Sequence, residues 1–445
     1  MRVAQALLAL AVISASALAQ EPGKVAVESY TLANGLKVHL VEDHSSQVVA
    51  VDVWYDVGAR NERAGRTGFA HLFEHMMFQG SANVKKAEHF QFIEKAGGFL
   101  NGSTTIDRTN YFEVLPSNRL NLGLWLESDR MRSLAITQPN LDNQREAVKE
   151  ERRMRMDNQP YIGVVIDSIA SLYDRDKCFA YAHSVIGSMN DLNAAKVEDV
   201  AAFFKLYYAP NNASLVVAGD FEPAEAKKLI EQYFADVPRV PAPPKVNCEQ
   251  AFNTGALRRT VTDKNATLAA SVAFFRVPEE AHEDHPAVEL LSNILGQGES
   301  SRLNRAVVRE AKAAAAAQTL GLYGPTRGPN ALAVLAIANQ GVAVDSVEKL
   351  VAAQIQRIAA EGVTEAELSK AKNSFRSSKI MERESALNVA ESVHYAETFL
   401  GDPLKVNTDL ARYGAVTVAD IKRVAAKYLQ TANSLVLMIV PPEAK

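Results

Sequence analysis

The chain repeats one pattern, a helix followed by a strand, at an interval of about half its length. The segment VEDVAAFFKLYYAPNNASLVV at 197–217 resembles VADIKRVAAKYLQTANSLVLM at 418–438. Each segment shows a helical apolar period, then a polar turn, then a short apolar run typical of a strand. A repeat of about 220 residues is far longer than a solenoid unit. The sequence therefore predicts two domains of one architecture.

A proline-rich segment lies between the two copies. VPRVPAPPKVN, residues 237–247, contains four prolines, which favour a stiff and extended connection. The predicted domains are therefore 20–236 and 248–445. Strand and helix patterns are mixed in both without strict alternation, so we expect an α+β fold: two homologous α/β domains with largely antiparallel sheets, each covered by helices.

Local patterns place several elements in the first domain. VESYTL and LKVHLVE flank Ala33-Asn34-Gly35, which indicates a β-hairpin. GFLNGSTTIDRTNYFEVLP, residues 98–116, is rich in Thr, Tyr and Phe and predicts a strand or hairpin. Helical periodicity predicts helices at 67–79, 87–96, 118–133 and 141–157.

The first residues indicate export. MRVAQALLALAVISASALAQ has one Arg, an apolar run and Ala17-Leu18-Ala19, typical of a secretory signal peptide over 1–19 that is cleaved after Ala19. We therefore expect a periplasmic protein. An N-terminal membrane anchor is the alternative, disfavoured because the apolar run is short. The only cysteines, Cys178 and Cys248, could pair in an oxidising compartment, but the sequence leaves this open.

Other bulk properties exclude some classes. The net charge of -4 gives no basic footprint for nucleic acid. Beyond the first residues, no apolar run reaches the roughly 18 residues that span a bilayer. We therefore expect no nucleic-acid partner and no membrane span in the mature chain.

The segment GFAHLFEHMMFQG, residues 68–80, places polar groups in an apolar helix. With about 100° per residue, His71 at 0° puts His75 near 40° and Glu74 near -60°, so the three share one arc. An unpaired buried carboxylate would be costly, and a divalent metal held by two i,i+4 histidines removes that cost. Core histidines bonded to backbone carbonyls are the alternative. His-x-x-Glu-His is, however, the inverted zinc-peptidase (inverzincin) signature.

A catalytic zinc needs a third protein ligand, and NLDNQREAVKEERRMRMDNQP offers Glu146, Glu150 and Glu151. Counted from Leu141 at about 100° per residue, the apolar face lies near 290°. Glu151 falls at about 280°, whereas Glu146 and Glu150 fall near 140° and 180° on the solvated side. Glu151 is therefore the expected third ligand.

This arrangement predicts the chemistry. With Zn²⁺ held by two histidines and Glu151, the carboxylate of Glu74 is free to act as general base in amide hydrolysis. No other cofactor is needed.

Three stretches resemble the pitrilysin/insulinase zinc metallopeptidases, and within them the half-length group similar to mitochondrial processing peptidase. They are TGFAHLFEHMMFQGS, GGFLNGSTTIDRTNYFEVLP and NQREAVKEERRMRMDNQPY. The resemblance implies zinc bound by His71, His75 and Glu151, with Glu74 as base. It also implies that the chain is one half of a clamshell around a chamber that admits short or unfolded peptides.

Two further site residues follow from the resemblance. Asn101 matches a substrate-contacting Asn beside an edge strand, to which peptide would add as an extra strand; a turn-forming role is the alternative. Many relatives carry Glu where this chain has Gln144. Gln keeps the hydrogen bonding but loses the charge, so we expect Gln144 to support the site from behind the ligands.

The second half departs from the family pattern. Relatives that complete their own site carry an Arg and a Tyr seven positions apart, but VVREAKAAAAAQT has Arg309 and then Ala316. Alanine cannot donate a hydrogen bond to an oxyanion, and the alanine run favours a helix. We therefore expect a homologous subunit without zinc to supply Arg and Tyr in a heterodimer, with a homodimer as the alternative. Tyr323 is a candidate substitute within this chain.

The sequence thus predicts a zinc endopeptidase of the periplasm. A catalytically inactive assembly subunit of the same fold is the main alternative, although such subunits commonly lose metal ligands. A solute-binding protein would leave the His-Glu-His group unexplained.

Overall fold

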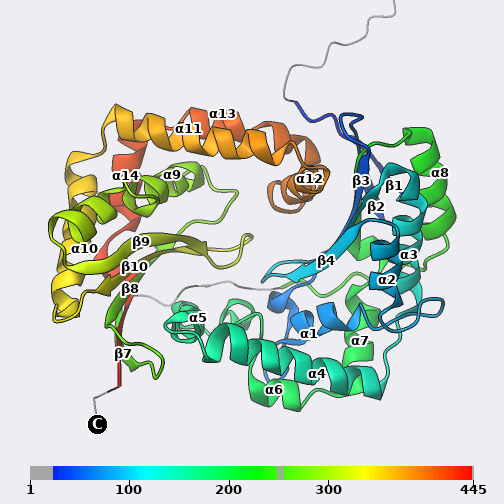
Figure 1. Ribbon diagram of the computed structural model, residues 1–445, viewed down its shortest axis with the longest axis horizontal. Helices are drawn as coiled ribbons and strands as arrows, with labels where there is room; N and C mark the ends of the chain where they lie inside the picture. Colours follow the sequence, from blue (N-terminus) through cyan, green and yellow to red (C-terminus); the bar gives the residue numbers. More distant parts are fainter. Residues whose placement is uncertain (1–23, 247, 249–251, 253–254, 443–445) are drawn as a thin grey trace, which may run out of the picture.

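A computed structural model of the protein describes residues 24–246, 248, 252 and 255–442. The chain forms two β-sheets, each covered by helices (Figure 1). The predicted signal peptide over 1–19 lies outside the described residues. Among the helices that are described, none combines the length and apolar character needed to cross a membrane.

The first sheet has six strands in the order β1-β2-β6-β3-β5-β4. β2 and β6 are parallel, and all other neighbours are antiparallel. β1 and β2 form the hairpin predicted around Ala33-Asn34-Gly35, and β4 and β5 form the one predicted in 98–116. The strands are β1 (Glu28–Thr31), β2 (Lys37–Glu42), β3 (Val48–Tyr55), β4 (Phe99–Thr104), β5 (Thr109–Pro116) and β6 (Ala213–Gly219).

The second sheet repeats this topology. Its order is β7-β11-β8-β10-β9, with β7 and β11 parallel and the rest antiparallel. Apart from β1, each strand therefore has a counterpart at the same place in the first sheet. The predicted fold class is confirmed. The strands are β7 (Leu257–Thr262), β8 (Ala270–Val277), β9 (Ala314–Tyr323), β10 (Asn330–Ala338) and β11 (Ser434–Val440).

Helices follow the same division along the chain. The first half contains α1 (Phe69–Met76), α2 (Glu88–Lys95), α3 (Leu120–Ser133), α4 (Gln138–Arg152), α5 (Ile162–Ile169), α6 (Met189–Asn193), α7 (Val197–Tyr207) and α8 (Pro223–Phe234). The second half contains α9 (His285–Gly296), α10 (Val344–Glu361), α11 (Glu365–Glu382), α12 (Ala386–Leu400), α13 (Asp409–Gly414) and α14 (Val418–Tyr428). The four helices expected in the first domain all form, and α4 continues as a π-helical turn over Arg153–Asp157.

The two repeated segments form α7–β6 and α14–β11, and both strands are buried on both faces. In β6, Leu215 and Val217 face the main core of the first sheet, whereas Val216 and Ala218 face α12. β11 alternates in the same way between two clusters. Because alternate strand residues point to opposite faces, burial of both faces explains why these strands are continuously apolar.

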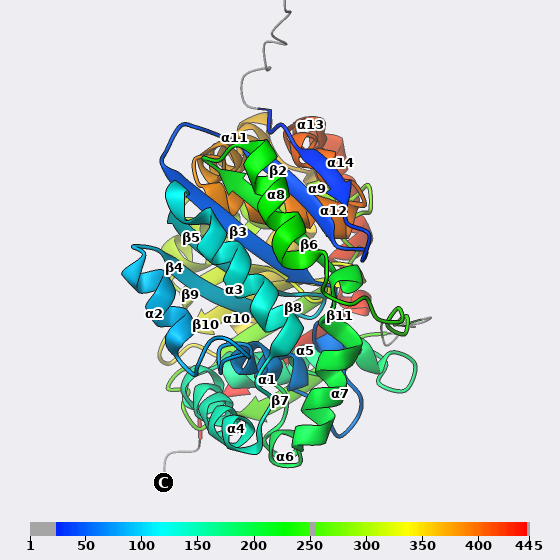
Figure 2. The ribbon, with the colours of Figure 1, turned by 90° about the vertical axis from the view of Figure 1, so that its right-hand side faces the viewer.

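The halves of the chain are interlocked. α12, from the second half, packs Val393 and Ala396 against the inner face of the first sheet. The segment around α5, from the first half, packs Val165 and Leu172 against the second sheet. Figure 2 shows α12 beside β2 and β6. The predicted limits at 236 and 248 stay a prediction, but each sheet is covered in part by the other half of the chain.

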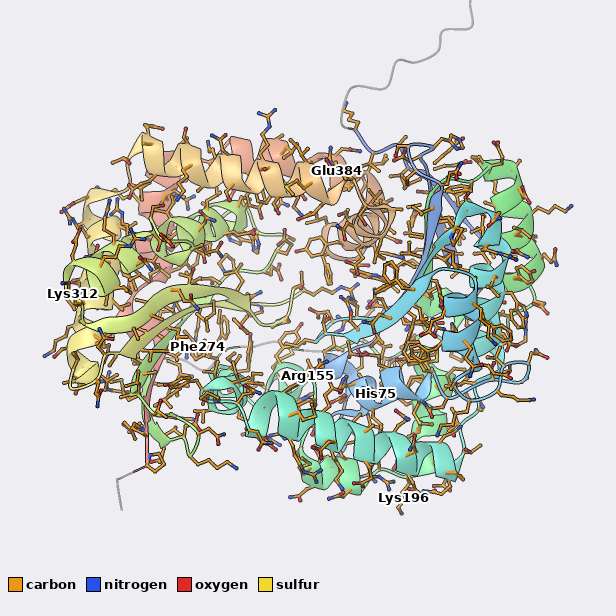
Figure 3. The ribbon with its side chains drawn as sticks, in the orientation of Figure 1. His75, Arg155, Lys196, Phe274, Lys312 and Glu384 are labelled. Carbon is orange, nitrogen blue, oxygen red and sulfur yellow. A yellow bond between two sulfur atoms is a disulfide. The ribbon has the colours of Figure 1, made fainter. Side chains whose placement is uncertain are left out.

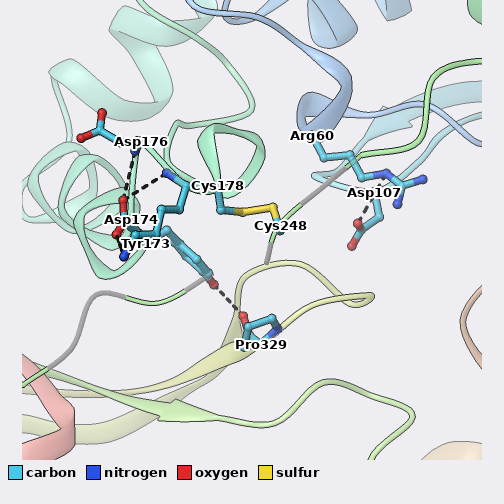
Figure 4. Close-up of a disulfide and its surroundings, with 9 residues drawn as sticks. Arg60, Asp107, Tyr173, Asp174, Asp176, Cys178, Cys248 and Pro329 are labelled. Carbon is cyan, nitrogen blue, oxygen red and sulfur yellow. Dashed lines mark hydrogen bonds and ion pairs between the residues drawn. A yellow bond between two sulfur atoms is a disulfide. The ribbon is translucent and has the colours of Figure 1, made fainter. Parts of the chain in front are cut away.

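A disulfide joins Cys178 to Cys248 (Figure 4). It links the segment after α5 to the chain beyond the predicted linker. Beside it, Tyr173 donates a hydrogen bond to the carbonyl of Pro329, 3.0 Å away. The question that the sequence left open is thereby answered, and the bond joins the first half of the chain to the start of the second half.

The helix expected from the alanine run is wrong. Residues Ala314–Tyr323 form β9, which pairs with β10, and Ala314 and Ala317 are buried in the second core. The helix preference of alanine over other residues is under about 1 kcal/mol per residue. Pairing with a neighbouring strand and burial of the small side chains outweigh it.

Candidate active site

Helix α1 begins at a glycine and is capped by a buried acid. Gly68 has φ +84°, and a Cβ there would lie 2.6 Å from the carbonyl oxygen of Ile186. The Glu62 carboxylate accepts hydrogen bonds from the backbone amides of Gly68 and Ala70, at 2.8 and 2.7 Å. A carboxylate at a helix N-terminus satisfies free amides and the helix dipole. Glu62 thus fixes the start of the helix that carries the motif.

The structure brings His71, His75 and Glu151 together. Oε2 of Glu151 lies 3.1 Å from Nε2 of His75 and 3.6 Å from Nε2 of His71. Figure 3 shows His75 on α1 and Arg155 just beyond α4. Arg155 pairs with the other oxygen of Glu151 at 2.9 Å, which leaves Oε2 facing the two imidazoles.

The other two acids of α4 point away. The side chains of Glu146 and Glu150 are 63% and 57% exposed, whereas that of Glu151 is 17% exposed. Glu146 pairs with Lys149 and Glu150 with Arg153. The helical geometry used on the sequence therefore selected the acid that the structure places beside the histidines.

These donors fit a zinc ion. Ligand atoms about 2.0–2.1 Å from a tetrahedral ion are about 3.3 Å apart, close to the two distances from Glu151. His71, Glu74 and His75 also form a group whose ligand atoms lie within 4.8 Å of one another. Burial and the nearby His75 lower the pKa of His71 to about 4, which keeps its imidazole neutral, as metal ligation requires.

Gln144 supports this cluster from behind. Nδ1 of His75 lies 3.3 Å from Oε1 of Gln144, so Gln144 orients the ring, as carboxylates and carbonyls do behind metal-bound histidines. Burial would lower the pKa of His75, but its hydrogen bond to Glu151 and the charge of Glu74 raise it. The hydrogen bond to His75 lowers the pKa of Glu151.

Glu74 is held by the neighbouring hairpin. Thr104, at the end of β4, donates a hydrogen bond to Oε2 of Glu74 at 2.6 Å. Gly102 permits the close approach, since a Cβ there would lie 3.3 Å from Cγ of Glu74. Burial raises the pKa of Glu74, and the Thr104 hydrogen bond opposes this shift. A raised carboxylate pKa suits a group that takes and returns a proton near neutral pH.

The cluster opens into a cleft of about 440 Å³. Asn101 lines it from the edge strand β4, and its side chain accepts a hydrogen bond from the amide of Gly102 at 2.9 Å. Phe78 and Phe90 form an apolar wall. The residues that line the cleft are His71, Glu74, His75, Phe78, Gln79, Phe90, Asn101, Gly102, Ser103, Thr104, Gln144, Glu151 and Arg155.

No lining residue of this cleft comes from the second half of the described chain. Arg309 instead pairs with Glu299, and Ala316 lies on β9. Tyr323, the candidate substitute, is not among the residues that line this cleft, and its ring packs on the apolar cluster that covers the second sheet. The end of β9 to which it belongs is fixed in register against β10.

A second buried group resembles a metal site, but its carboxylates are paired with an arginine. His89, Glu113 and Glu127 have ligand atoms within 4.8 Å of one another. The guanidinium of Arg130 contacts both carboxylates, and it stacks on Tyr111 at 4.4 Å. This cluster is a buried ion-pair network beneath the cleft.

Sequence reasoning missed Glu62, Thr104 and Arg130. Thr104 lies in a segment recognised as β, but only the folded hairpin shows which residue reaches Glu74. A signal for Glu62 exists in principle, because an acid shortly before a helix start is a capping pattern. The intervening loop hides it.

The fold is that of one half of a clamshell, and the candidate site is of the zinc-peptidase type. Residues 37–175 match the family model described as Insulinase (Peptidase family M16), and 194–375 match that described as Peptidase M16 inactive domain. The chain is 31% identical over 424 residues to the "Zinc protease PqqE" of Helicobacter pylori, covering 93% of both chains. The chain belongs to peptidase family M16.

Further comparisons agree with this family. A crystal structure of a protease from Helicobacter pylori superposes with a TM-score of 0.87 at 28% identity, covering 94% of this chain and 100% of that one. The chain is 22% identical to a probable mitochondrial-processing peptidase subunit beta of Arabidopsis thaliana, over 92% of this chain and 78% of that protein. The periplasmic protease PqqL of Escherichia coli shares the fold, with a TM-score of 0.76 at 17% identity; 93% of this chain matches 47% of that one.

Proposed function

We propose that this protein is a zinc-dependent endopeptidase in which His71, His75 and Glu151 hold the metal and Glu74 is the general base. The observation that carries the proposal is the convergence of two imidazoles and one inward carboxylate beside a second, buried carboxylate. Zinc bound there would polarise the scissile carbonyl and acidify a water molecule.

Glu74 would perform the proton transfers. One of its oxygens is held by Thr104, and we assign the other to the proton taken from the attacking water. The same carboxyl group would then deliver that proton to the leaving amine. Gln144 would keep the His75 ring in place. Because its side-chain amide is uncharged, Gln144 would add no charge near the metal.

The substrate class follows from the edge strand. β4 ends the first sheet and pairs only with β5 among the described strands. An extended peptide could add to its free edge through main-chain hydrogen bonds, which demand little of its sequence. Asn101 lies on this strand and would contact the peptide. We therefore propose short or unfolded peptides as substrates.

A homologous subunit is proposed to complete the site. Among the described residues, the second half places no oxyanion donor in the cleft, and Ala316 stands where relatives carry Tyr. The partner would lack the zinc motif and supply Arg and Tyr across the chamber, with a homodimer as the alternative. Similarity in fold to about half of the PqqL chain supports assembly from two halves.

We also propose the periplasm as the compartment. The N-terminal sequence pattern predicts cleavage after Ala19, and the Cys178–Cys248 bond fits an oxidising compartment.

The test combines metal content with cleavage. The mature chain should bind one zinc and should cleave an unfolded peptide when mixed with a homologous subunit that lacks the motif, and neither subunit should cleave alone. Full activity of the isolated chain would overturn the need for a partner only. A mature chain that binds no zinc would instead favour the inactive assembly subunit.

A further inference from the structure

A second cavity, of about 300 Å³, lies where the two halves of the chain meet. The first half contributes Trp54, Asp56 and Arg108 to its wall, and the second half contributes Arg327 and Glu397. It lies on the side of the first sheet that α12 covers. Several charged side chains thus line the cavity, and both halves of the chain are needed to form it.

Most charges in this cavity are already paired. Lys37 lies 2.8 Å from Glu397, and Arg327 lies 2.5 Å from Asp56. A cationic ligand would find both acids occupied. The cavity therefore offers no free carboxylate to a ligand.

Arg108 is the exception. Its Nη1 donates to neutral acceptors, the carbonyl oxygen of Ser103 at 2.9 Å and Oδ1 of Asn110 at 3.1 Å. Its guanidinium lies over the ring of Trp54, 4.8 Å from the centroid. Among the described residues, no carboxylate lies within ion-pair distance of it. These contacts orient the guanidinium but do not neutralise it.

The charges of Asp52, Glu391 and Glu74 favour the charged form of Arg108, but none of these carboxylates forms an ion pair with it. The two oxygens of Asp52 accept hydrogen bonds from Trp54 and Asn110, and burial raises the pKa of Asp52 well above its ordinary value. Burial likewise lowers the pKa of Arg108. A cation that is desolvated without a paired anion is energetically costly, and an incoming carboxylate would relieve that cost.

Arg108 lies in the turn between β4 and β5, close in the chain to residues that line the cleft. Ser103, whose carbonyl it binds, also lines the cleft around His71, and the next residue, Thr104, holds Glu74. We propose that Arg108 anchors a carboxylate of the bound peptide, either its free C-terminus or an acidic side chain. This inference rests on the proposed peptidase function and adds a preference for anionic substrate groups next to the edge strand.

Peptide binding tests the anchor without requiring cleavage. The zinc-loaded Glu74→Gln chain is titrated, by fluorescence anisotropy, with three labelled peptides that have no other acidic group. One ends in a free carboxylate, the second in an amide, and the third in an amide preceded by one Asp. A charge-assisted hydrogen bond predicts about tenfold tighter binding of a peptide that carries the carboxylate.

The pattern across the three peptides identifies the source of the carboxylate. Tight binding of the first alone assigns the C-terminus, and tight binding of the third assigns an acidic side chain. Arg108→Gln should abolish the difference and Arg108→Lys should keep part of it. Arg63→Gln, the same loss of charge at a 76% exposed side chain, should keep all of it. Because the interaction is electrostatic, the preference should also weaken as salt rises.

Equal binding of the three peptides, no binding of any, or an unchanged preference in Arg108→Gln would overturn the anchor. Cleavage of the amide peptide by the chain with intact Glu74, mixed with its partner, is measured in parallel. Cleavage without a carboxylate preference would refute the anchor alone. A preference for the carboxylate without cleavage would refute the peptidase and leave the anchor standing.

Discussion

Replacing Glu151 by Gln tests the metal site most directly. Oε2 of Glu151 lies 3.1 and 3.6 Å from the two imidazoles, so this carboxylate is one of three proposed ligands. Structural zinc sites with four ligands bind with about 10–16 kcal/mol, or about 3 kcal/mol per ligand. At about 1.4 kcal/mol per tenfold change, losing this ligand should weaken zinc binding by about 100-fold.

The matched control is Glu150→Gln. It is the same substitution one position earlier on α4, at a side chain that is 57% exposed and paired with Arg153. Zinc affinity is measured by competition with a chromogenic chelator, and zinc content by elemental analysis after dialysis. Glu150→Gln should match the unsubstituted chain in both assays.

Two results would refute the reasoning. Unchanged zinc affinity in Glu151→Gln would mean that the carboxylate is not a ligand. Equal weakening by both substitutions would mean that the effect comes from the general charge of α4. After removal and re-addition of zinc, the chain mixed with its partner subunit should also regain activity, because no other group is proposed to carry out the hydrolysis.

Three further outcomes are expected. Glu74→Gln should keep its zinc while cleavage falls by about 10²–10⁴-fold, the usual range for a lost general base; loss of zinc in this variant would argue against a base role. Burial lowers the pKa of His394 to about 3, so the unfolded chain takes up a proton below its ordinary pKa of about 6.5 and the folded chain does not. As the pH is lowered from 6 to 4, this group should therefore lower the free energy of unfolding by about 1.4 kcal/mol per pH unit. Denaturant titrations at several pH values should show that the free energy of unfolding of His394→Gln depends less steeply on pH by this amount. The Cys178–Cys248 bond closes a loop with a separation of 70 residues, so its loss should cost up to about 4 kcal/mol, and an unchanged denaturation midpoint in the Cys178→Ser, Cys248→Ser double variant would contradict this.

Several features could be predicted because they depend on local periodicity. The duplicated helix–strand segments predicted two domains of one architecture, and apart from β1 the two sheets have the same strand order. The angular positions on one helix separated Glu151 from Glu150, since the apolar face of α4 has one direction only. His71, Glu74 and His75 share an arc of α1 for the same reason. In each case, a repeat of 3.6 or 2 residues decides which side chains face the core.

Other features depend on which segments meet, and no local pattern encodes that. The alanine run has a helical preference, yet pairing with β10 makes it a strand. Thr104 and Arg108 lie four positions apart in one hairpin, but only the folded sheet shows that one contacts Glu74 and the other lines a cavity formed by both halves. The disulfide likewise required the partner segments to be in place.

The interlocking of the halves has a consequence for how the site is held. α12 packs on the inner face of the first sheet, and His394 on that helix bonds the Asp52 carbonyl of β3 at 3.0 Å and the Ser214 hydroxyl of β6 at 2.9 Å. Both strands belong to the sheet whose edge borders the cleft. A first half produced without the second would therefore expose this face of its sheet and leave buried polar groups without partners, which is costly. The half that carries the His71 cluster is accordingly stabilised by the second half, even though no lining residue of the cleft around His71 comes from the second half of the described chain.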